Sequence, residues 1–233
     1  MTATLQVQGG IVATYHGIKV PAAPHLGPGM IAAMTAGTYE RHEVELALAH
    51  VPRGSRVLEL GAGSGVAGAV MARKCQPRAV LSVEANPRLL PHIAALYAEN
   101  GLQYLMDLRH GVVLSAPDAP LTVPFFVRGN FLGSSLAEPD HGLVQPMQVP
   151  VIRYDRLKAS FPHDVLLMDI EGGELDLLRH ADLSGITLLI AEFHRSIFGR
   201  EGLRECRALL TAQGFVQDAA ASAGGVHVWR RPK

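Results

Sequence analysis

The 233-residue chain is poor in cysteine and carries no net charge. Its two cysteines lie far apart and outside any Cys-x-x-Cys pattern, so the sequence indicates neither a disulfide framework nor a structural zinc site. Lysine and arginine number 21, as do aspartate and glutamate, so no net field attracts nucleic acid or an anionic membrane surface. We therefore expect a reduced, cytoplasmic setting and no nucleic-acid partner.

Long apolar runs and targeting signals are also lacking. No apolar stretch approaches the length of a membrane-spanning helix, and the first ten residues have neither the basic nor the apolar segment of a secretory signal. Hydrophobic residues nevertheless make up 48% of the chain and charged residues 18%, which is typical of a folded protein. The length predicts one large domain, and we expect no membrane association.

Strand and helix patterns alternate from residue 56 onward. Short apolar runs at 57–60 and 79–83 are each followed by a helical pattern, and the alternation resumes with strands at 165–169 and 187–192. This order predicts parallel βαβ units. We expect an α/β fold with a doubly wound, mostly parallel, Rossmann-like sheet that a C-terminal antiparallel hairpin closes.

Two segments fall outside this alternation. Alternating residues on both sides of Gly9-Gly10 predict an N-terminal β-hairpin, and prolines keep the following stretch irregular. We assign residues 1–36 to this N-terminal extension and residues 37–233 to the main domain. Within the main domain, residues 116–148 are rich in proline and glycine, and they predict a loop and ribbon insert. The pattern around 112–114 predicts one further parallel strand.

A glycine loop follows the first buried strand. The sequence Glu59-Leu-Gly-Ala-Gly-Ser-Gly65 allows a tight turn and a close approach to a ligand, at the strand end where doubly wound sheets bind ligands. The next strand ends in Glu84, whose carboxylate can accept hydrogen bonds from both hydroxyls of a ribose. The pattern therefore indicates a nucleoside-containing ligand, although a tight turn without a ligand would also explain the glycines.

The loop favours S-adenosylmethionine over a dinucleotide. Val66 stands where the dinucleotide fingerprint requires its third glycine, and the Gly-Lys-Ser/Thr of a phosphate-binding loop is missing. Glu59, two residues before the first glycine, would repel a phosphate. S-adenosylmethionine has no phosphate and carries a sulfonium and an α-ammonium, so an acid is tolerable there.

Acidic residues and a histidine follow the next two strands. Asp169, Glu171 and Glu174 come after one strand, and Glu192 and His194 end the other. Both strand ends lie on the ligand side of a parallel sheet, so these side chains should converge where a transferred methyl group would sit. The Asn/Asp-Pro-Pro-aromatic motif of many amine and amide methyltransferases is absent, which disfavours a nitrogen acceptor.

His194 and Asp169 are the candidate catalytic residues. An unperturbed imidazole titrates near neutrality and suits a general base that takes the proton of a hydroxyl acceptor, while Asp169 could orient the acceptor or contact the ammonium of the donor. Glu171 and Glu174 could instead simply stabilise a helix N-terminus, and His194 could be a hydrogen-bonded residue at a strand end. A divalent metal at Asp169, Glu171 and His194 is a less favoured alternative, because such clusters also serve without one.

The chain resembles the FkbM-type S-adenosylmethionine-dependent methyltransferases. The resemblance spans roughly residues 37–214, and its most specific part is the Asp-Ile-Glu-Gly-x-Glu block that begins at Asp169. It implies a class I methyltransferase fold and O-methylation of sugar or polyketide hydroxyls. The chain departs from the family pattern Asp-x-Gly-Ala-x-x-Gly at Glu59 and at the added Gly63. The matching segments are residues 37–40, 57–62, 83–87, 133–136, 154–157, 168–174 and 192–194.

We therefore expect an O-methyltransferase that uses S-adenosyl-L-methionine, releases S-adenosyl-L-homocysteine and acts on a small-molecule hydroxyl, with the 116–148 insert near the acceptor and no metal ligands. Alternatives are a non-catalytic S-adenosylmethionine-binding module and, less favoured, an NAD-dependent oxidoreductase. The expected cofactor-binding residues come from the glycine loop, the strand ends and the matched motifs: Tyr39, Glu59, Gly61, Ala62, Gly63, Gly65, Glu84, Ala85, Asn86 and Asp169.

Overall fold

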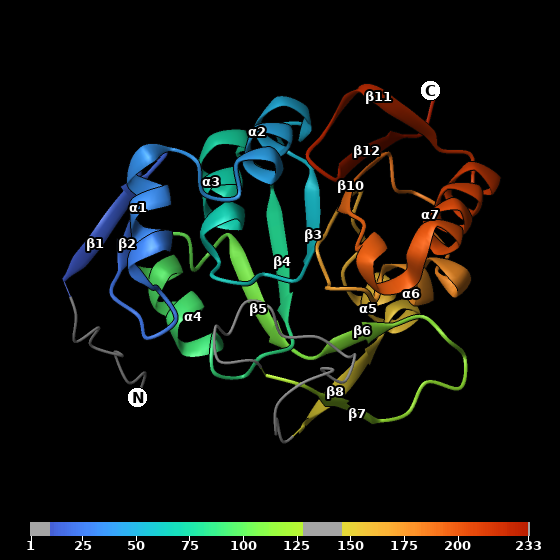
Figure 1. The fold of residues 1–233 in the computed structure, drawn as a ribbon, viewed down its shortest axis with the longest axis horizontal. Coiled ribbons are helices and arrows are strands. Elements are labelled where there is room, and N and C mark those ends of the chain that lie inside the picture. The colour runs from blue at the N-terminus through green and yellow to red at the C-terminus, as the bar shows by residue number, and fades with distance from the viewer. Residues whose placement is uncertain (1–9, 128–145, 233) are drawn as a thin grey trace.

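The computed structural model describes residues 10–127 and 146–232 and is built around a seven-stranded sheet in the order β11-β12-β10-β9-β3-β4-β5 (Figure 1). β12 (Val226–Arg230) runs antiparallel to β10 and pairs with the edge strand β11 (Val216–Ala223). The expected α/β fold with a C-terminal antiparallel hairpin is thereby confirmed. The five parallel strands are β3 (Arg56–Leu60), β4 (Ala79–Glu84), β5 (Met106–His110), β9 (Val165–Met168) and β10 (Leu188–Glu192).

Helices cover both faces of this sheet. In β3, Val57 belongs to one hydrophobic cluster and Leu58 and Leu60 belong to another, because successive side chains of a strand point to opposite faces. This two-sided burial explains the nearly continuous apolar runs of the strands. One face packs against α1 (Pro28–Ala36), α2 (Arg41–His50), α3 (Val66–Cys75) and α4 (Leu90–Glu99), and the other packs against α5 (Tyr154–Ser160), α6 (Glu174–His180) and α7 (Arg195–Ala212).

The order of the strands reverses between β3 and β9. From β3, the sheet extends to β4 and β5 on one side and to β9 and β10 on the other. A doubly wound sheet opens a crevice at the carboxyl ends of its strands at such a point. The residues that follow Leu60 and Met168 therefore meet at one edge of the sheet, which is the geometry of the class I methyltransferase fold.

A smaller sheet lies beside this edge. Its order is β6-β8-β7, with β6 (Val112–Leu114) parallel and β7 (Thr122–Phe125) antiparallel to β8 (Met147–Arg153). The β7–β8 pair lies within and next to the expected 116–148 insert, of which residues 128–145 are outside the described part of the chain.

The parallel strand expected around residues 112–114 is β6, which pairs in parallel with β8 in the smaller sheet. The sequence did not identify β5, which is a further parallel strand of the main sheet. The sequence of β5, Met-Asp-Leu-Arg-His, gives no continuous apolar run, because it is an edge strand and only Met106 in it is fully buried.

The N-terminal hairpin lies further along the chain than expected. It joins β1 (Ile11–Tyr15) to β2 (Ile18–Pro21), whereas residues 1–9 of the expected hairpin lie outside the described part. The stretch expected to be irregular contains α1, because Pro28 occupies its first turn, where proline is tolerated. The boundary at residue 37 stays a prediction. No described helix has the length and apolar character needed to cross a membrane.

Candidate functional site

The glycine loop passes directly over the backbone that follows β9. Gly61 has a φ of +85°, and a Cβ at this position would overlap the carbonyl oxygen of Asp169. The Asp169 amide in turn donates to the carbonyl oxygen of Leu60 at 2.9 Å. Only glycine satisfies both the backbone conformation and this close approach, so the loop and the β9–α6 turn form one unit.

Glu84 ties the glycine loop to the end of β4. Its Oε2 accepts a hydrogen bond from the Gly63 amide at 2.8 Å, and its Oε1 accepts one from the Asn86 amide at 2.7 Å. Burial raises the pKa of Glu84, and these amide donors partly oppose the rise. A carboxylate has about four lone-pair sites, so both oxygens retain the capacity to accept ribose hydroxyls.

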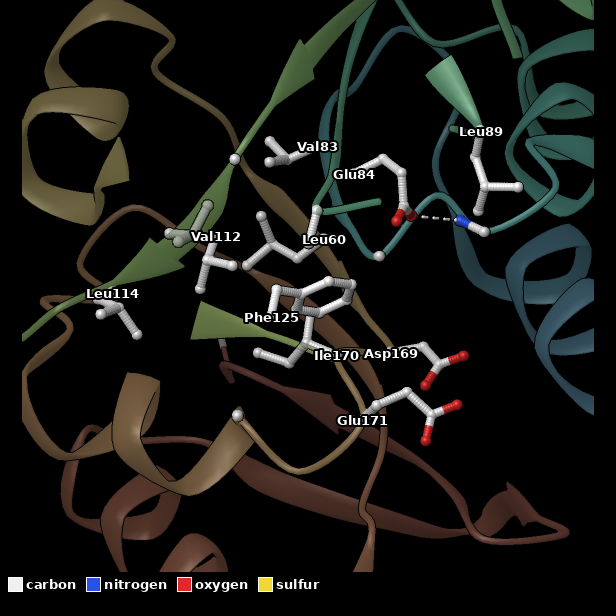
Figure 2. Close-up of a pocket in the computed structure, with 16 residues that line it drawn as sticks. Leu60, Val83, Glu84, Leu89, Val112, Leu114, Phe125, Asp169, Ile170 and Glu171 are labelled. Carbon is white, nitrogen blue, oxygen red and sulfur yellow. Dashed lines mark hydrogen bonds between the residues drawn. The ribbon is translucent and has the colours of Figure 1, made fainter. Parts of the chain in front are cut away.

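A cleft of about 740 Å³, including its open mouth, lies at the carboxyl ends of β3, β4 and β9. Figure 2 shows Glu84 on one wall and Asp169 and Glu171 on another, with Phe125 between them. Of the predicted cofactor-binding residues, Gly61, Gly63, Glu84, Ala85 and Asp169 line this first cleft, together with the apolar side chains of Leu60, Val83, Leu89, Val112, Val113, Leu114, Phe125 and Ile170.

A second cleft, of about 630 Å³, adjoins the first and shares Leu60, Gly61, Gly63 and Asp169 with it. Its walls are acidic, and none of the described residues that line it is a lysine or arginine. The sequence prediction included Glu59, Ala62 and Asp169 of this wall but missed two of its acids on and beside α2. Glu40 could have been found, because it ends the Gly-Thr-Tyr-Glu motif. The acidic residues of the second cleft are Glu40, Glu43, Glu59, Asp169 and Glu192.

Burial makes four acids of the second cleft, Glu40, Glu59, Asp169 and Glu192, hard to ionise. It raises the pKa of Glu40, of Glu59 and of Glu192 to about 7 each. Burial and the nearby charge of Glu192 raise the pKa of Asp169 well above its usual range, and its Oδ1 is buried without a hydrogen-bond partner among the described residues. A cationic group in this cleft would favour the charged carboxylates, so the geometry and charge suit an organic cation.

Three predicted cofactor residues lie behind the clefts and support the loop. The Tyr39 hydroxyl donates to Ser64 Oγ at 3.0 Å, and Gly65 begins α3 with a φ of +77°. Asn86 is buried and accepts from the Arg88 amide through its side chain. None of these three is among the residues that line either cleft, and a direct role in binding a cofactor stays a prediction.

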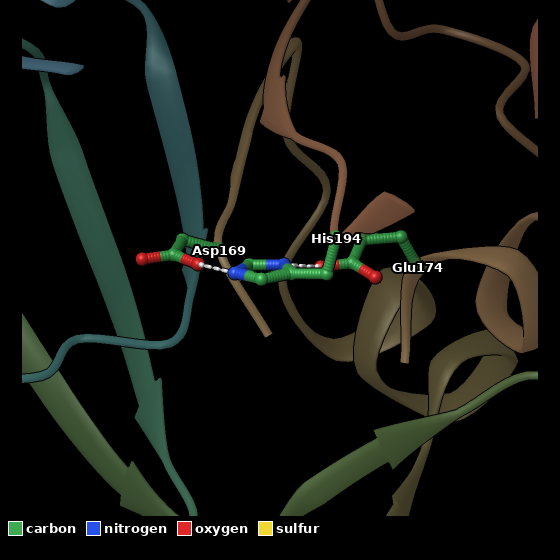
Figure 3. Close-up of side chains that lie close together, drawn as sticks. All are labelled: Asp169, Glu174 and His194. Atoms are coloured by element: carbon green, nitrogen blue, oxygen red, sulfur yellow. Dashed lines mark hydrogen bonds and ion pairs between the residues drawn. The ribbon is translucent and has the colours of Figure 1, made fainter. Parts of the chain in front are cut away.

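His194 lies between carboxylates, as the sequence predicted for this strand end. Its Nδ1 is 2.6 Å from Oε1 of Glu174, and its Nε2 is 3.6 Å from Oδ1 of Asp169 (Figure 3) and 3.4 Å from Oε2 of Glu171. Burial lowers the pKa of His194, but the hydrogen bond and charge of Glu174, with the charges of Asp169 and Glu171, outweigh this effect and raise it to about 9. The near-neutral pKa of an unperturbed imidazole is therefore not the value in the folded protein.

Two acids at the clefts have an unfavourable backbone conformation. Glu40 has a φ of 41° and Glu171 a φ of 50°, in the left-handed region that costs a non-glycine residue roughly 1–3 kcal/mol. Such outliers concentrate at functional sites, because a surrounding structure must hold them in place. Their location at the two clefts supports a functional role.

Asp169, Glu174 and His194 can each present one ligand atom within 4.8 Å of the others. This is the group that could hold a metal ion among the residues the structure describes. His194 Nδ1 already faces Glu174, so a bound ion would compete with that hydrogen bond or use Nε2. The expectation that the site works without a metal ligand stays a prediction.

Comparison with known protein families gives a match to one part of the chain, which contains some of the residues of the candidate site. Residues 30–112, about a third of the chain, match the family model of the protein-L-isoaspartate(D-aspartate) O-methyltransferases. This segment includes the glycine loop and Glu84 but neither Asp169 nor His194. No curated protein matches the sequence.

Three solved structures give the extent of the structural likeness. A protein of the NADB-Rossmann superfamily from Streptococcus agalactiae is 13% identical, with 81% of this chain and 67% of that chain covered and a TM-score of 0.49. A ribosomal-protein methylase from Lactobacillus delbrueckii is 16% identical, with 84% and 80% covered and a TM-score of 0.47. A precorrin-6y methyltransferase from Geobacter metallireducens is 13% identical, with 96% and 99% covered and a TM-score of 0.48. At these scores, the likenesses do not bear on the chemistry of this chain.

Proposed function

We propose that the chain binds S-adenosyl-L-methionine and transfers its methyl group to a hydroxyl oxygen of a small molecule, as an FkbM-type methyltransferase. The observation that carries this proposal is the pair of joined clefts around the glycine loop. One is largely apolar with a carboxylate at the end of β4, and the other is walled by acids. A ligand with a neutral nucleoside at one end and positive charges at the other matches both.

The two ends of the donor would lie in different clefts. Glu84 would accept the ribose hydroxyls, and Ala85, Leu89 and Val112 offer apolar surface for the base. The α-ammonium and sulfonium would be attracted to the acids of the second cleft, among them Glu40 and Glu59. The family match supports this assignment, because residues 30–112 contain the donor-binding loop and the β4 carboxylate.

The same acids disfavour a dinucleotide. A pyrophosphate beside the glycine loop would face Glu59 and Glu40, which carry more negative charge as the pH rises through about 7. It would also lack the third glycine of the dinucleotide fingerprint, where Val66 stands. An NAD-dependent oxidoreductase is therefore the weaker alternative.

His194 is the group that can hold the proton of the acceptor. When bound, S-adenosyl-L-methionine supplies the methyl group, whose carbon bonds to the acceptor oxygen while the carbon–sulfur bond breaks and its electron pair stays on sulfur. Nε2 of His194 would take the hydroxyl proton, and Asp169 and Glu171, 3.6 and 3.4 Å from it, lie at the edge of the first cleft. A positive charge beside these two carboxylates would offset their effect on the pKa of His194. The imidazole would then lose its own proton before it takes the proton of the acceptor.

Calorimetric titration and a product assay test this function together. We expect S-adenosyl-L-methionine and S-adenosyl-L-homocysteine to bind and NAD not to bind. Mass spectrometry should then detect a methyl ether when the protein is incubated with the donor and a panel of hydroxylated small molecules. Donor binding with no methylated product from any acceptor class would favour the non-catalytic module, and tight binding of NAD alone would overturn the proposal.

A further inference from the structure

Glu174 is a fully buried acid with one main partner. Its side chain has no exposed surface, and its Oε1 lies 2.6 Å from Nδ1 of His194 and accepts the Gly172 amide at 3.2 Å. No ion pair with a lysine or arginine is formed by Glu174 within the described ranges. A buried carboxylate is costly unless it is paired and hydrogen-bonded, and among the described residues His194 is the group that pairs with Glu174.

The hydrogen bond determines which nitrogen of His194 faces Asp169 and Glu171, two carboxylates that line the first cleft. An ionised carboxylate can only accept, so Nδ1 must donate and carry a proton. In the neutral imidazole, Nε2 is then the unprotonated nitrogen. Figure 3 shows the ring lying between the two carboxylates, with Nδ1 toward Glu174 and Nε2 toward Asp169.

We infer that Glu174 is a positioning residue that fixes the ring and the tautomer of His194, so that Nε2 is directed at the acceptor. This inference rests on the proposed function, in which Nε2 takes the acceptor proton. The arrangement follows the general logic of a carboxylate that orients a catalytic histidine. Glu174 touches neither cleft among the lining residues, so it acts only through His194.

A purely structural role makes a different prediction. Glu174 is the first residue of α6 and accepts the Gly172 amide, so it also stabilises the start of that helix. Asp176 lies in the same helical turn, but it is 70% exposed and pairs with Arg179 rather than with His194. Loss of either carboxylate would weaken the start of the helix, whereas only loss of Glu174 would change the imidazole.

Several ionisable groups around His194 affect its titration, and the test must leave them unchanged. Asp169 and Glu171 face it from the turn after β9, Glu174 from α6 and Glu192 from β10. On α7, the buried thiol of Cys206 lies near Glu174. Glu174→Gln changes only one of these groups and keeps its size, and Asp176→Asn is the matched control.

The test is an NMR titration of the ligand-free protein, with the His194 ring signals assigned by their loss in His194→Gln. In the unmodified protein, the neutral ring should carry its proton on Nδ1. Glu174→Gln should lower the titration midpoint of His194 by roughly one to two pH units, because a charged hydrogen bond is lost. Asp176→Asn should leave it unchanged. In turnover, Glu174→Gln should lower kcat with little change in donor affinity.

Each outcome decides the inference. A neutral His194 with its proton on Nε2 overturns it, even if Glu174→Gln fails to fold. An unchanged midpoint in Glu174→Gln, or an equal shift in Asp176→Asn, also overturns it. Because these measurements need neither donor nor acceptor, they stand apart from calorimetric binding, whose failure would instead overturn the proposed function.

Discussion

Glu84 serves two purposes at the residue scale, since it holds Gly63 and faces the first cleft. Glu84→Ala should weaken the binding of S-adenosyl-L-homocysteine at least about tenfold, because hydrogen bonds to a charged group are lost. Calorimetric titration measures this change. Asp107→Ala, which removes an exposed acid from β5, is the matched control. Equal affinity of Glu84→Ala and the parent would show that the donor binds elsewhere.

His194 should control the rate rather than donor binding. His194→Ala should lower kcat by roughly 10²-fold or more, because the acceptor hydroxyl loses its base, and should leave donor affinity nearly intact. His180→Ala, at the exposed end of α6, should have no effect. In the parent, kcat/KM should rise with pH toward about 9, since the imidazole must first lose its proton. Full activity in His194→Ala would contradict the assignment, and loss of parental activity in chelator would indicate a metal.

At the scale of elements, the contact between the glycine loop and the β9–α6 turn should limit donor binding. Gly61→Ala adds a Cβ that overlaps the Asp169 carbonyl oxygen in a left-handed conformation, so the loop or the turn must move. We expect it to weaken donor binding at least about tenfold and to lower the melting temperature. Calorimetric titration and thermal unfolding measure these effects.

Gly185→Ala is the matched control for Gly61→Ala. Gly185 also has a positive φ, of 83°, but a Cβ there meets no atom within 4 Å. The control therefore reproduces the backbone strain without the overlap, and it should lower the melting temperature while leaving donor affinity unchanged. Equal donor affinity in both variants would mean that the loop does not need its close approach to Asp169.

The sequence predicted the central strands, which are buried on both faces, and missed the edge strand β5. Strands β3, β4, β9 and β10 have continuous apolar sequences, because both faces pack against helices. The edge strand β5 has no such run. The pattern of residues 201–213 predicts a helix, whereas the structure begins α7 at Arg195 and interrupts it at Gly199, whose φ of 72° and ψ of −172° are not helical.

The site was predictable where residues follow strand ends. The convergence of Asp169, Glu171 and His194 follows from the order of parallel strands, and Glu84 follows from the same rule. Glu43 of α2 reaches the second cleft only through tertiary packing, so its position there was not readable from spacing. The sequence left Glu174 open between a helix start and a functional role, because only the folded chain brings it 2.6 Å from the His194 ring.

At the scale of the whole molecule, the proposed function would divide the chain into a donor-binding part and an acceptor-binding part. The family match ends at residue 112, where β6 begins the smaller sheet that supplies Val112 and Phe125 to the first cleft. His194 and its carboxylates come later still. Under the proposed function, the matched segment and Asp169 would bind the donor, and the choice of acceptor would depend on the part of the chain that this family model does not match.

The same cluster of charges should make global stability depend on pH. The pKa of His194 rises from 6.5 to about 9 on folding, so its stabilising contribution is fully present below pH 6.5 and is lost as the pH rises through 9. Burial raises the pKa of Glu59 from 4.5 to about 7, so its contribution to stability is present below pH 4.5 and is lost as the pH rises through about 7. His25, lowered from 6.5 to about 4, has the opposite effect, but only below pH 6.5.

The window from pH 6.5 to 9 contains the titration of His194 and part of that of Glu40, Glu59 and Glu192, so a comparison with His194→Gln is needed to remove the contribution of the other groups. Urea unfolding at the two ends of this window gives the free energy of unfolding for each protein. The parent should lose on the order of 2 kcal/mol more than the variant, because only the parent releases the extra proton that the folded state holds. An equal loss in both proteins would mean that the carboxylates around His194 do not hold its proton in the folded state. The alkaline rise of kcat/KM would then lose its physical basis as well.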